Sequence, residues 1–359
     1  MSSIPEKGLP VKWRVPVAYG YAGPAVAGGK VYVTDYVKKT GEIRNSPSAR
    51  DTLTGSERIR CLDAATGKQI WEYAYDRPYA VSYGSGPRAT PAVAQGLVVS
   101  LGAEGDLVCL KAEDGSPVWK KDLNKEYKTE TPLWGHSAHP LIVGDTLYCL
   151  VGGSGSLAVA FDLKTGHETW KALSAPESQG YCPPTMIRHE GKEQLLIWDP
   201  RNISSLNPAD GAVNWTVKLQ PAYQMSIAAP RLSGDLLFAG GMGREAVLLE
   251  LGGAEPKEVW RGTPKTAVYS VNSTPFLEDG VIYGCDADTS NFVAVDMKDG
   301  QRLWTTLAPT IGEGKKGRHG TAFIVKNGDR FWLFSETGDL ILAKLSRDTY
   351  EELGRFKVL

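Results

Sequence analysis

The chain has 359 residues, of which 42% are hydrophobic and ten are tryptophan, so it holds enough apolar side chains for a sizeable core. Lys and Arg total 40 against 41 Asp and Glu, which gives a formal net charge of −1. This balance argues against a dedicated nucleic-acid or anionic-membrane binder, because such proteins carry a basic excess or stripe. Five cysteines, none of them in a CxxC pair, predict neither a disulfide framework nor a metal cluster.

The first residues of the chain carry no targeting signal that we recognise. Residues 1–10 contain no apolar stretch of the kind found in signal peptides, and no later span approaches a transmembrane helix. We therefore expect no transmembrane segment. Two alternatives for the compartment stay open at this point, a cytoplasmic protein or one whose leader lies outside this chain.

A unit of about 40–50 residues, the length of a β-propeller blade, is repeated along the chain. Its clearest copy is Cys61–Trp71, in which an apolar strand runs into an Asp, a Gly and then a Trp. The equivalent tryptophans, Trp119, Trp170, Trp215, Trp260 and Trp304, follow at spacings of 48, 51, 45, 45 and 44 residues. A seventh copy lacks its Trp and ends near Gly354.

Residues 91–123 illustrate one unit as four short strands separated by Gly and Asp turns. The Asp side chain can cap nearby backbone N–H groups, and the Gly accepts the positive φ of a tight turn. Each unit opens on a strand that begins at one of Pro24, Pro91, Pro140, Pro184, Pro230, Pro275 and Ala322. We predict an all-β fold, a β-propeller of four-stranded antiparallel blades with seven complete repeats, that forms a single domain over residues 1–359.

The N-terminal run Val11–Val15 looks like an additional fourth strand whose first three strands are missing. We expect Trp13 beside the C-terminal region, near residues 331–358, because pairing there removes exposed strand edges. This strand either completes a seven-bladed ring or belongs to an eighth blade.

The motif at Asp63–Trp71, which returns at Asp162–Trp170 and Asp296–Trp304, resembles the tryptophan-docking repeat of pyrroloquinoline quinone (PQQ) propellers. This family, the quinoprotein alcohol dehydrogenase-like superfamily, includes dehydrogenases and non-catalytic scaffolds such as outer-membrane protein assembly lipoproteins. The resemblance covers nearly the whole chain and implies an eight-bladed plan and a periplasmic or extracellular location. The fifth copy departs from it, with Pro256 where Gly is expected, and the adjacent Cys-Cys pair of the dehydrogenases is absent.

Loops that precede each opening strand, and loops between the second and third strands, fall on one face of a propeller. Polar and aromatic residues gather in these loops, and a ring of them at a channel mouth is a candidate pocket. The candidate ligand-binding residues are Tyr21, Arg88, Trp134, His136, His139, Tyr181, Gln224, Asn272, Arg318, His319, Trp198, Asp199, Asp286 and Glu336.

Several chemistries can be built from this set. His136, His139 and His319 could form a three-histidine metal site, with ordinary hydrogen-bonding histidines as the alternative. Arginines at 88, 244 and 318 could hold a carboxylate or phosphate, and the aromatic residues could stack on a sugar or a flat cofactor. We predict no metal site. The insertion Tyr36–Glu57 is expected to be a lid, a partner contact or a flexible loop.

The leading functional hypothesis is a binding scaffold for a protein partner or a glycan, with its ligand at the loop face. The second is a PQQ- and calcium-dependent alcohol or sugar dehydrogenase, which rests on the resemblance alone; Asp35, Asp199, Asp286 or Glu336 could supply calcium ligands. A lyase or hydrolase acting on sugars is a third alternative. Hydrolase elbows and phosphate-binding loops are absent from the sequence.

Overall fold

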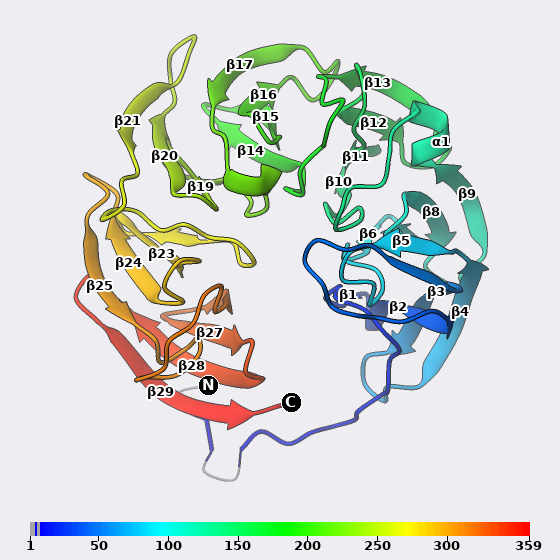
Figure 1. Cartoon of the computed structure of the whole chain (residues 1–359), viewed down its shortest axis with the longest axis horizontal. Helices are drawn as coiled ribbons and strands as arrows, with labels where there is room; N and C mark the ends of the chain where they lie inside the picture. The colour runs from blue at the N-terminus through cyan, green and yellow to red at the C-terminus, as the bar shows by residue number, and fades with distance from the viewer. Residues whose placement is uncertain (1–3, 6–7) are drawn as a thin grey trace. The chain divides into compact units, whose positions relative to one another are not determined.

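The computed structural model describes residues 4–5 and 8–359. In this part of the chain the strands form seven sheets, each built from four consecutive strands in antiparallel order (Figure 1). The predicted seven complete four-stranded units are therefore confirmed. The chain divides into two compact units, residues 11–184 with 208–212, and residues 185–207 with 213–359 and the described part of 1–10.

The unit of residues 11–184 contains blades one to three. Blade one has a fifth short strand, because β5 pairs with β3. A single helical turn, α1 (Leu123–Tyr127), follows blade two and is capped at its N-terminus by the side chain of Asp122. The strands are β1 (Ala25–Ala27), β2 (Lys30–Thr40), β3 (Asp51–Asp63), β4 (Gln69–Asp76), β5 (Tyr79–Val81), β6 (Ala92–Ala94), β7 (Leu97–Leu101), β8 (Asp106–Lys111), β9 (Pro117–Asp122), β10 (Leu141–Val143), β11 (Thr146–Leu150), β12 (Ala158–Asp162) and β13 (Glu168–Ala172).

The unit of residues 185–359 contains blades four to seven and one short 3₁₀ turn, η1 (Ala222–Gln224). Its strands are β14 (Thr185–His189), β15 (Lys192–Trp198), β16 (Asn202–Leu206), β17 (Val213–Lys218), β18 (Arg231–Ser233), β19 (Leu236–Gly241), β20 (Glu245–Glu250), β21 (Lys257–Arg261), β22 (Phe276–Glu278), β23 (Val281–Cys285), β24 (Phe292–Asp296), β25 (Arg302–Thr306), β26 (Ala322–Asn327), β27 (Arg330–Ser335), β28 (Asp339–Leu345) and β29 (Tyr350–Lys357). Among the described residues, no helix is long and apolar enough to cross a membrane.

The Asp-Gly turn works in blade one as its sequence predicts. The carboxylate of Asp63 accepts bonds from the backbone N–H (2.8 Å) and the hydroxyl (2.7 Å) of Thr66. Gly67 has φ 71°, a conformation that residues with a Cβ seldom adopt. Trp71, four residues later, donates its indole N–H to the carbonyl of Ala112 in the next blade at 3.2 Å. The turn thus carries the tryptophan that joins one blade to its neighbour.

Trp13 makes the same blade-joining contact, although it precedes the first blade. Its indole donates to the carbonyl of Ala64 at 3.0 Å, and its ring lies against Gly67. We expected Trp13 beside residues 331–358, but that region instead contacts Ile4, next to Gly354, and Gly8, next to the ring of Phe356. The reason is chemical: the turn of blade one offers both a bare Gly and a carbonyl acceptor. In the described chain, residues 11–18 belong to none of the sheets, and β29 pairs with β28 alone.

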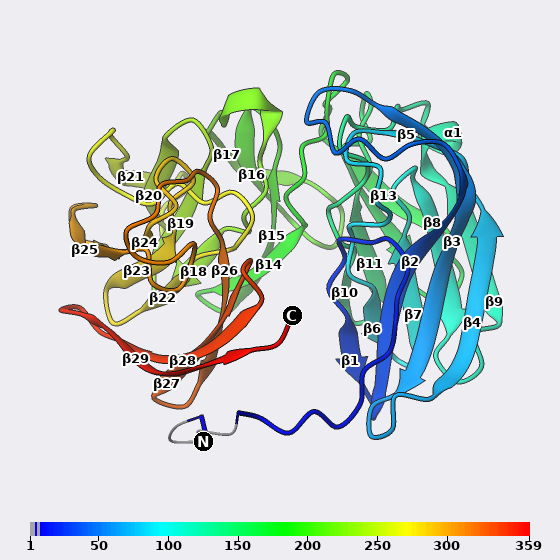
Figure 2. The ribbon, with the colours of Figure 1, turned by 60° about the horizontal axis from the view of Figure 1, so that its bottom comes forward.

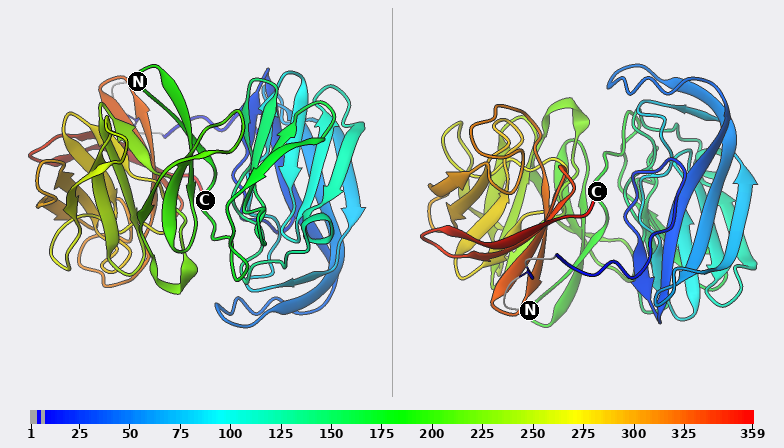
Figure 3. Two further views of the ribbon diagram at one scale, coloured as in Figure 1. Left: turned by 90° about the horizontal axis from the view of Figure 1, so that it is seen from above. Right: turned by 90° about the horizontal axis from the view of Figure 1, so that it is seen from below.

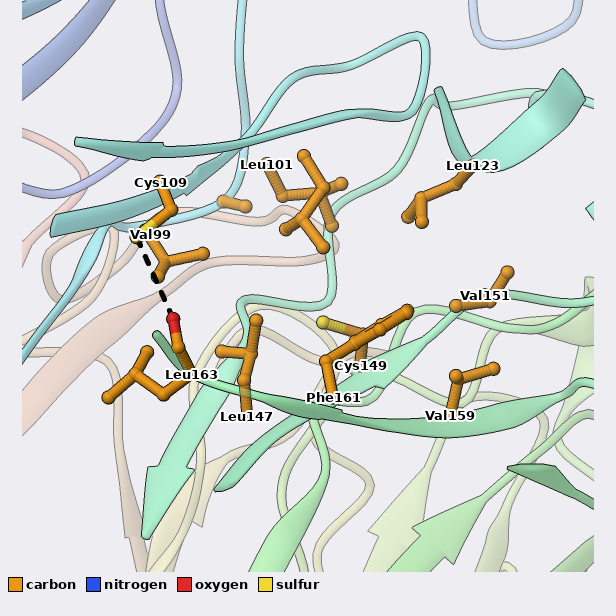
Figure 4. Close-up of a cluster of buried hydrophobic side chains, with 12 residues drawn as sticks. Val99, Leu101, Cys109, Leu123, Leu147, Cys149, Val151, Val159, Phe161 and Leu163 are labelled. Atoms are coloured by element: carbon orange, nitrogen blue, oxygen red, sulfur yellow. Dashed lines mark hydrogen bonds between the residues drawn. The ribbon is translucent and has the colours of Figure 1, made fainter. Parts of the chain in front are cut away.

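The cores lie between neighbouring blades. Between blades two and three, buried residues of β7, β8, β11 and β12 interdigitate around Phe161 (Figure 4). The thiol of Cys109 points at the carbonyl of Leu163 in this cluster, with a separation of 4.0 Å. All five cysteines are free and buried. Burial raises the pKa of the Cys149 thiol, and the five residues occupy positions suited to small apolar side chains.

Blade one carries the largest departure from the repeat within its unit. Its strands β2 and β3 pair from Lys30–Asp63 to Thr40–Thr54, and the first three residues of β3 pair with β5 (Figure 2). In both views of Figure 3 the blue hairpin projects beyond the other strands of residues 11–184. The insertion predicted at Tyr36–Glu57 is therefore mostly strand, with residues 41–50 as its connecting loop.

Candidate functional site

Three exposed tyrosines lie on the loops that lead into blades one and two. Tyr19, Tyr21 and Tyr83 keep 47%, 49% and 36% of their surface exposed. Tyr19 pairs with Tyr36 of β2 in a short antiparallel bridge, and the N–H of Tyr21 donates to the carbonyl of Pro87 at 2.9 Å. We call Tyr19, Tyr21 and Tyr83 the tyrosine surface. Backbone hydrogen bonds on both sides hold its loops in place.

The two loops of the tyrosine surface approach each other very closely. A Cβ built on Gly86 would lie 2.3 Å from the carbonyl oxygen of Tyr19, so only Gly fits there. Gly86 also has φ 97°, and Tyr83 has φ 50°, which is uncommon for a residue with a Cβ. The close approach at Gly86 and the positive φ of Tyr83 constrain the backbone of the two loops.

Arg88 contacts the loops that carry the tyrosine surface. Its guanidinium donates to the carbonyls of Ser82 (2.8 Å), Tyr83 (2.5 Å) and Gly86 (2.5 Å). It also lies 5.3 Å from the ring centre of Tyr21, within the range of a cation–π contact. Anion binding was one possibility for Arg88, with a structural arginine as its alternative, and these contacts tie the loop of residues 82–86 together.

A buried carboxylate lies beneath the same loops. Glu57 of β3 accepts hydrogen bonds from the hydroxyls of Tyr75 and Tyr79 and from the N–H of Ala103. Burial raises the pKa of Glu57 and raises the pKa values of both tyrosines well above their ordinary value. Tyr79 also stacks on Tyr36, with ring centres 4.0 Å apart. This network ties β3, β4, β5 and the start of the blade-two turn into one block.

The loop of residues 41–50 is tied at several points to neighbouring segments. Trp134 donates its indole N–H to the carbonyl of Pro47 at 3.0 Å. Arg50 donates to the carbonyls of Ala80 and Thr131 at 2.6 and 3.0 Å. Whether the insertion acts as a lid, a partner contact or a flexible loop stays a prediction.

His136 is a structural residue. It is 1% exposed, and its ring nitrogens lie 3.0 Å from Oδ1 of Asn124 and 2.9 Å from Nε2 of Gln179. Burial lowers the pKa of His136 to about 4, so the ring is neutral and both nitrogens are engaged. Neighbouring candidates differ: His139 is exposed, whereas Tyr181 is buried and packs against Trp134 with ring centres 5.4 Å apart.

In the unit of residues 185–359, two predicted residues shape a turn. Trp198 is fully buried and donates its indole N–H to the carbonyl of Leu219 at 3.1 Å. Asp199 accepts from the backbone N–H groups of Arg201 (2.6 Å) and Asn202 (2.9 Å). Neither side chain is available for a ligand in this arrangement.

The remaining candidates of this unit are either hydrogen-bonded to neighbouring side chains or exposed to solvent. Asp286 is buried and accepts from Arg302 (3.1 Å) and from Thr289 (2.7 Å). Partial desolvation raises the pKa of Glu336, against the lowering effects of a backbone hydrogen bond at Thr321 and of the nearby His319. Exposed side chains are those of Gln224, Asn272, Arg318 and Glu336. The predicted set is thus split between the two units, and its convergence on one pocket stays a prediction.

Three of the four acidic residues proposed for calcium are already hydrogen-bonded within the protein. Both carboxylate oxygens of Asp35 accept from Arg58 at 2.7 Å, and one also accepts from the N–H of Ala18. Asp199 accepts a hydrogen bond from the backbone N–H of Arg201, and Asp286 accepts one from the hydroxyl of Thr289. Across residues 4–5 and 8–359, no group of three or more His, Cys, Asp or Glu side chains could hold a metal ion. The three-histidine alternative therefore finds no support in the arrangement of these residues.

Sequence reasoning missed Glu57, Tyr19 and Tyr83 as site residues. Glu57 shares the buried face of β3 with Leu53, Ile59 and Cys61, so strict alternation along the strand could have marked it as buried. The exposure of Tyr19 and Tyr83 depends on how their loops pack, and no period of the sequence encodes that.

Comparison with known proteins identifies related sequences. The family model described as "Outer membrane protein assembly factor BamB" matches residues 55–197 and 199–347. An outer membrane protein assembly factor BamB from Yersinia pestis is 24% identical over 312 residues, which cover 82% of this chain and 75% of the relative. The protein of the same name from Moranella endobia is 26% identical over 219 residues, which cover 56% of this chain and 52% of the relative.

Solved structures share the fold. BamB from Moraxella catarrhalis aligns with a TM-score of 0.59 at 14% identity and covers 94% of this chain and 85% of that chain. A europium-containing methanol dehydrogenase aligns with a TM-score of 0.61 at 13% identity. The alignment covers 95% of this chain and 78% of the dehydrogenase chain. At such identities the likeness shows a β-propeller and nothing about activity.

Proposed function

The chain belongs to the family of outer membrane protein assembly factor BamB, and we propose that it is a periplasmic scaffold that binds a protein partner through the tyrosine surface. One observation carries this assignment: three tyrosines are exposed on two loops, residues 19–21 and 82–88, that backbone hydrogen bonds join to each other. Tyr is enriched among the residues that dominate binding energy at protein interfaces. Rigid loops lose little conformational entropy when they bind.

The supports beneath the surface favour binding over chemistry. Three of the five N–H groups of Arg88 donate to backbone carbonyls, and Glu57 is enclosed by two tyrosines and an amide. A general acid or base must reach the substrate proton, and neither group can do so from its position. The same holds for the buried, doubly bonded His136.

For the dehydrogenase alternative, the comparisons offer a shared fold. The structures that share it are the europium-containing methanol dehydrogenase and the quinohemoprotein alcohol dehydrogenase from Pseudomonas putida. The acidic residues among those the structure describes do not provide a calcium site. Their arrangement therefore supports no step of a quinone reaction. Titration with PQQ and calcium, followed by a dye-coupled alcohol assay, tests this alternative, and turnover would establish it.

Site-specific photo-crosslinking tests the scaffold. A benzophenone amino acid at position 21 or 83 should capture the same protein in the native cell, because both positions face one side of the same loops. The matched control is position 118, where Val118 is 39% exposed on the outer strand β9. Equal capture from all three positions, or capture of unrelated proteins from 21 and 83, would contradict the proposal.

Soluble glycans separate the two ligand classes of the scaffold hypothesis. A sugar that stacks on the tyrosines would compete with the crosslink, whereas a protein interface would not respond to it. Competition at modest sugar concentrations would move the assignment from a protein partner to a glycan.

A further inference from the structure

The loop that joins β25 to β26 concentrates positive charge. Within its Gly-rich residues 312–320, Lys315, Lys316, Arg318 and His319 fall in five consecutive positions. The side chains of both lysines and of Arg318 are exposed. In the described part of the chain, none of these three side chains takes part in an ion pair or a hydrogen bond. Three cations without a partner are suited to an anionic ligand.

Nearby acidic residues do not neutralise the loop. The carboxylate of Glu313 folds back on the start of the loop, where it accepts from the hydroxyl of Thr306 and from the N–H of Leu307 (3.0 Å). These hydrogen bonds, that of the Thr306 hydroxyl above all, lower the pKa of Glu313. Asp288, in a neighbouring turn, pairs with Arg244 at 3.1 Å. The charge of the loop cations is therefore available to a ligand.

The loop is held in place by its neighbours. The hydroxyl of Thr310 donates to the carbonyl of Ser290 at 2.6 Å, and the N–H of Gly320 donates to the hydroxyl of Ser290 at 2.9 Å. A Cβ built on Gly320 would lie 2.6 Å from the Cβ of Ser290. One built on Gly317 would lie 3.0 Å from Cδ1 of Ile311. Because the loop is already fixed, it loses little conformational entropy when a ligand binds.

Backbone and side-chain donors lie close together in this loop. The ammonium group of Lys315 lies over the loop itself, since a Cβ built on Gly312 would be 3.6 Å from its Nζ. The backbone N–H groups of Gly314, Lys316 and Gly317 have no hydrogen-bond partner in the part of the chain that the structure describes. Successive free N–H groups in a turn form a concavity that binds anions.

Two buried polar atoms beside the loop lack a partner as well. Nδ1 of His319 and Oγ of Ser270 are buried and form no hydrogen bond among residues 4–5 and 8–359. Their loops adjoin, because the N–H of His319 donates to the carbonyl of Ala287 (2.8 Å) and the N–H of Ala287 donates to that of Tyr269 (2.9 Å). Since buried polar groups are nearly always paired, these atoms indicate that a further polar group completes this end of the loop.

We propose that the loop of residues 312–320 binds a phosphate monoester, carried either by a soluble ester or by a lipid headgroup. Such a group bears a charge of about −1.5 to −2 at pH 7 and three strong acceptor oxygens. It therefore matches three cations and several N–H donors better than a single carboxylate does. Lys315, Lys316 and Arg318 supply the charge, and the backbone N–H groups around them supply the direction. The loop lies in the unit of residues 185–359, and this site does not depend on the tyrosine surface.

Equilibrium dialysis of the full chain with radiolabelled inorganic phosphate and with glycerol 2-phosphate tests the site. Binding should be saturable, should weaken as the salt concentration rises, and should be displaced by unlabelled phosphate far more effectively than by acetate. The double variant Lys315→Gln/Lys316→Gln and, independently, Arg318→Gln should each bind at least about tenfold more weakly, because each removes charge-assisted hydrogen bonds.

A matched double variant controls for the loss of charge. Lys298→Gln/Lys344→Gln removes the same charge from exposed positions of the same unit and should leave the affinity unchanged. All three variants should keep the melting temperature of the parent, because the altered side chains are exposed.

Vesicles distinguish the two sources of the phosphate group. Flotation of the parent, but not of the loop variants, with phosphatidylcholine vesicles that contain phosphatidic acid assigns a lipid headgroup. Binding of glycerol 2-phosphate without flotation assigns a soluble ester. Absence of saturable phosphate binding, equal weakening in the control variant, or displacement by acetate as effective as by phosphate would overturn the proposal. Binding of RNA or of an acidic peptide that phosphate does not displace would also overturn it.

Discussion

The tyrosine surface and the turn of blade five beside Trp215 depart from the same repeat in different ways. At the tyrosine surface the repeat is extended: β2 and β3 are lengthened, a fifth strand is added, and a buried carboxylate supports the loops. In the turn of blade five the Gly of the repeat is replaced by Pro256, and a cavity of about 620 Å³ is lined by this turn and by Trp215. The first departure adds strands and buried polar bonds, whereas the second changes one turn.

The largest expected effect on stability comes from removing the buried carboxylate of Glu57, beneath the tyrosine surface. Glu57→Ala leaves the hydroxyls of Tyr75 and Tyr79 and the N–H of Ala103 without their acceptor. Since each unsatisfied buried donor costs about 1–3 kcal/mol, the free energy of unfolding should fall by about 3–5 kcal/mol. Urea denaturation measures this, with the exposed Glu113→Ala as the control. A loss no larger than that of the control would mean that the carboxylate does not support the loops.

A pH dependence follows from His136 in the same unit. Its pKa falls from 6.5 to about 4 on folding, so the unfolded chain binds more protons between these values. Stability should therefore rise as pH increases from 4 to 6.5 and be lost as pH falls, by about 3 kcal/mol over the full interval. His136→Gln should remove this part of the pH dependence in denaturation curves measured across the interval. An unchanged slope would assign the dependence to other groups.

Two tryptophans with different neighbours should contribute equally to stability. Trp170 and Trp215 are similarly buried, at 9% and 6% exposed, although only Trp170 lies against a Gly of the following turn. Trp170→Ala and Trp215→Ala should each destabilise the fold by about 3–5 kcal/mol, because each removes a buried indole. Urea denaturation measures both losses, and a much smaller loss for Trp215→Ala would mean that its ring is less well packed than its burial indicates.

The smallest expected effect is a gain in stability. The variant in which residues 296–301 replace residues 250–257 should be more stable by about 1 kcal/mol, since it restores a docking contact and shortens a loop. Differential scanning calorimetry would record this as a rise in Tm. A fall in Tm would mean that the longer turn is itself required for packing of blade five.

Much of this fold could be predicted because the docking repeat is local. Asp63, Gly67 and Trp71 encode a turn and its tryptophan within nine residues, and the blade boundaries follow from the spacing. The departure at Pro256 was also visible in the sequence. Its consequence was not, because the cavity depends on the side chains of blade four that line it.

The functional surface was harder to predict because its residues are set by long-range packing. Arg88 was identified, but its three carbonyl partners come from a loop whose conformation depends on Gly86 and Tyr19. Trp198 and Asp199 were chosen for their residue types and proved to be buried structural groups. Residue type alone does not separate a ligand contact from a turn support.

Calorimetric titration of the purified, crosslink-identified partner against the full chain tests the central claim most directly. The variant that combines Tyr19→Ala, Tyr21→Ala and Tyr83→Asn should bind at least about a hundredfold more weakly, since interface tyrosines each contribute about 2 kcal/mol or more when they dominate binding. Asn is used at position 83 because it tolerates the positive φ found there. Its melting temperature should match that of the parent, because the three rings are exposed. Unchanged affinity in this folded variant would contradict the assignment of the tyrosine surface as the partner-binding site.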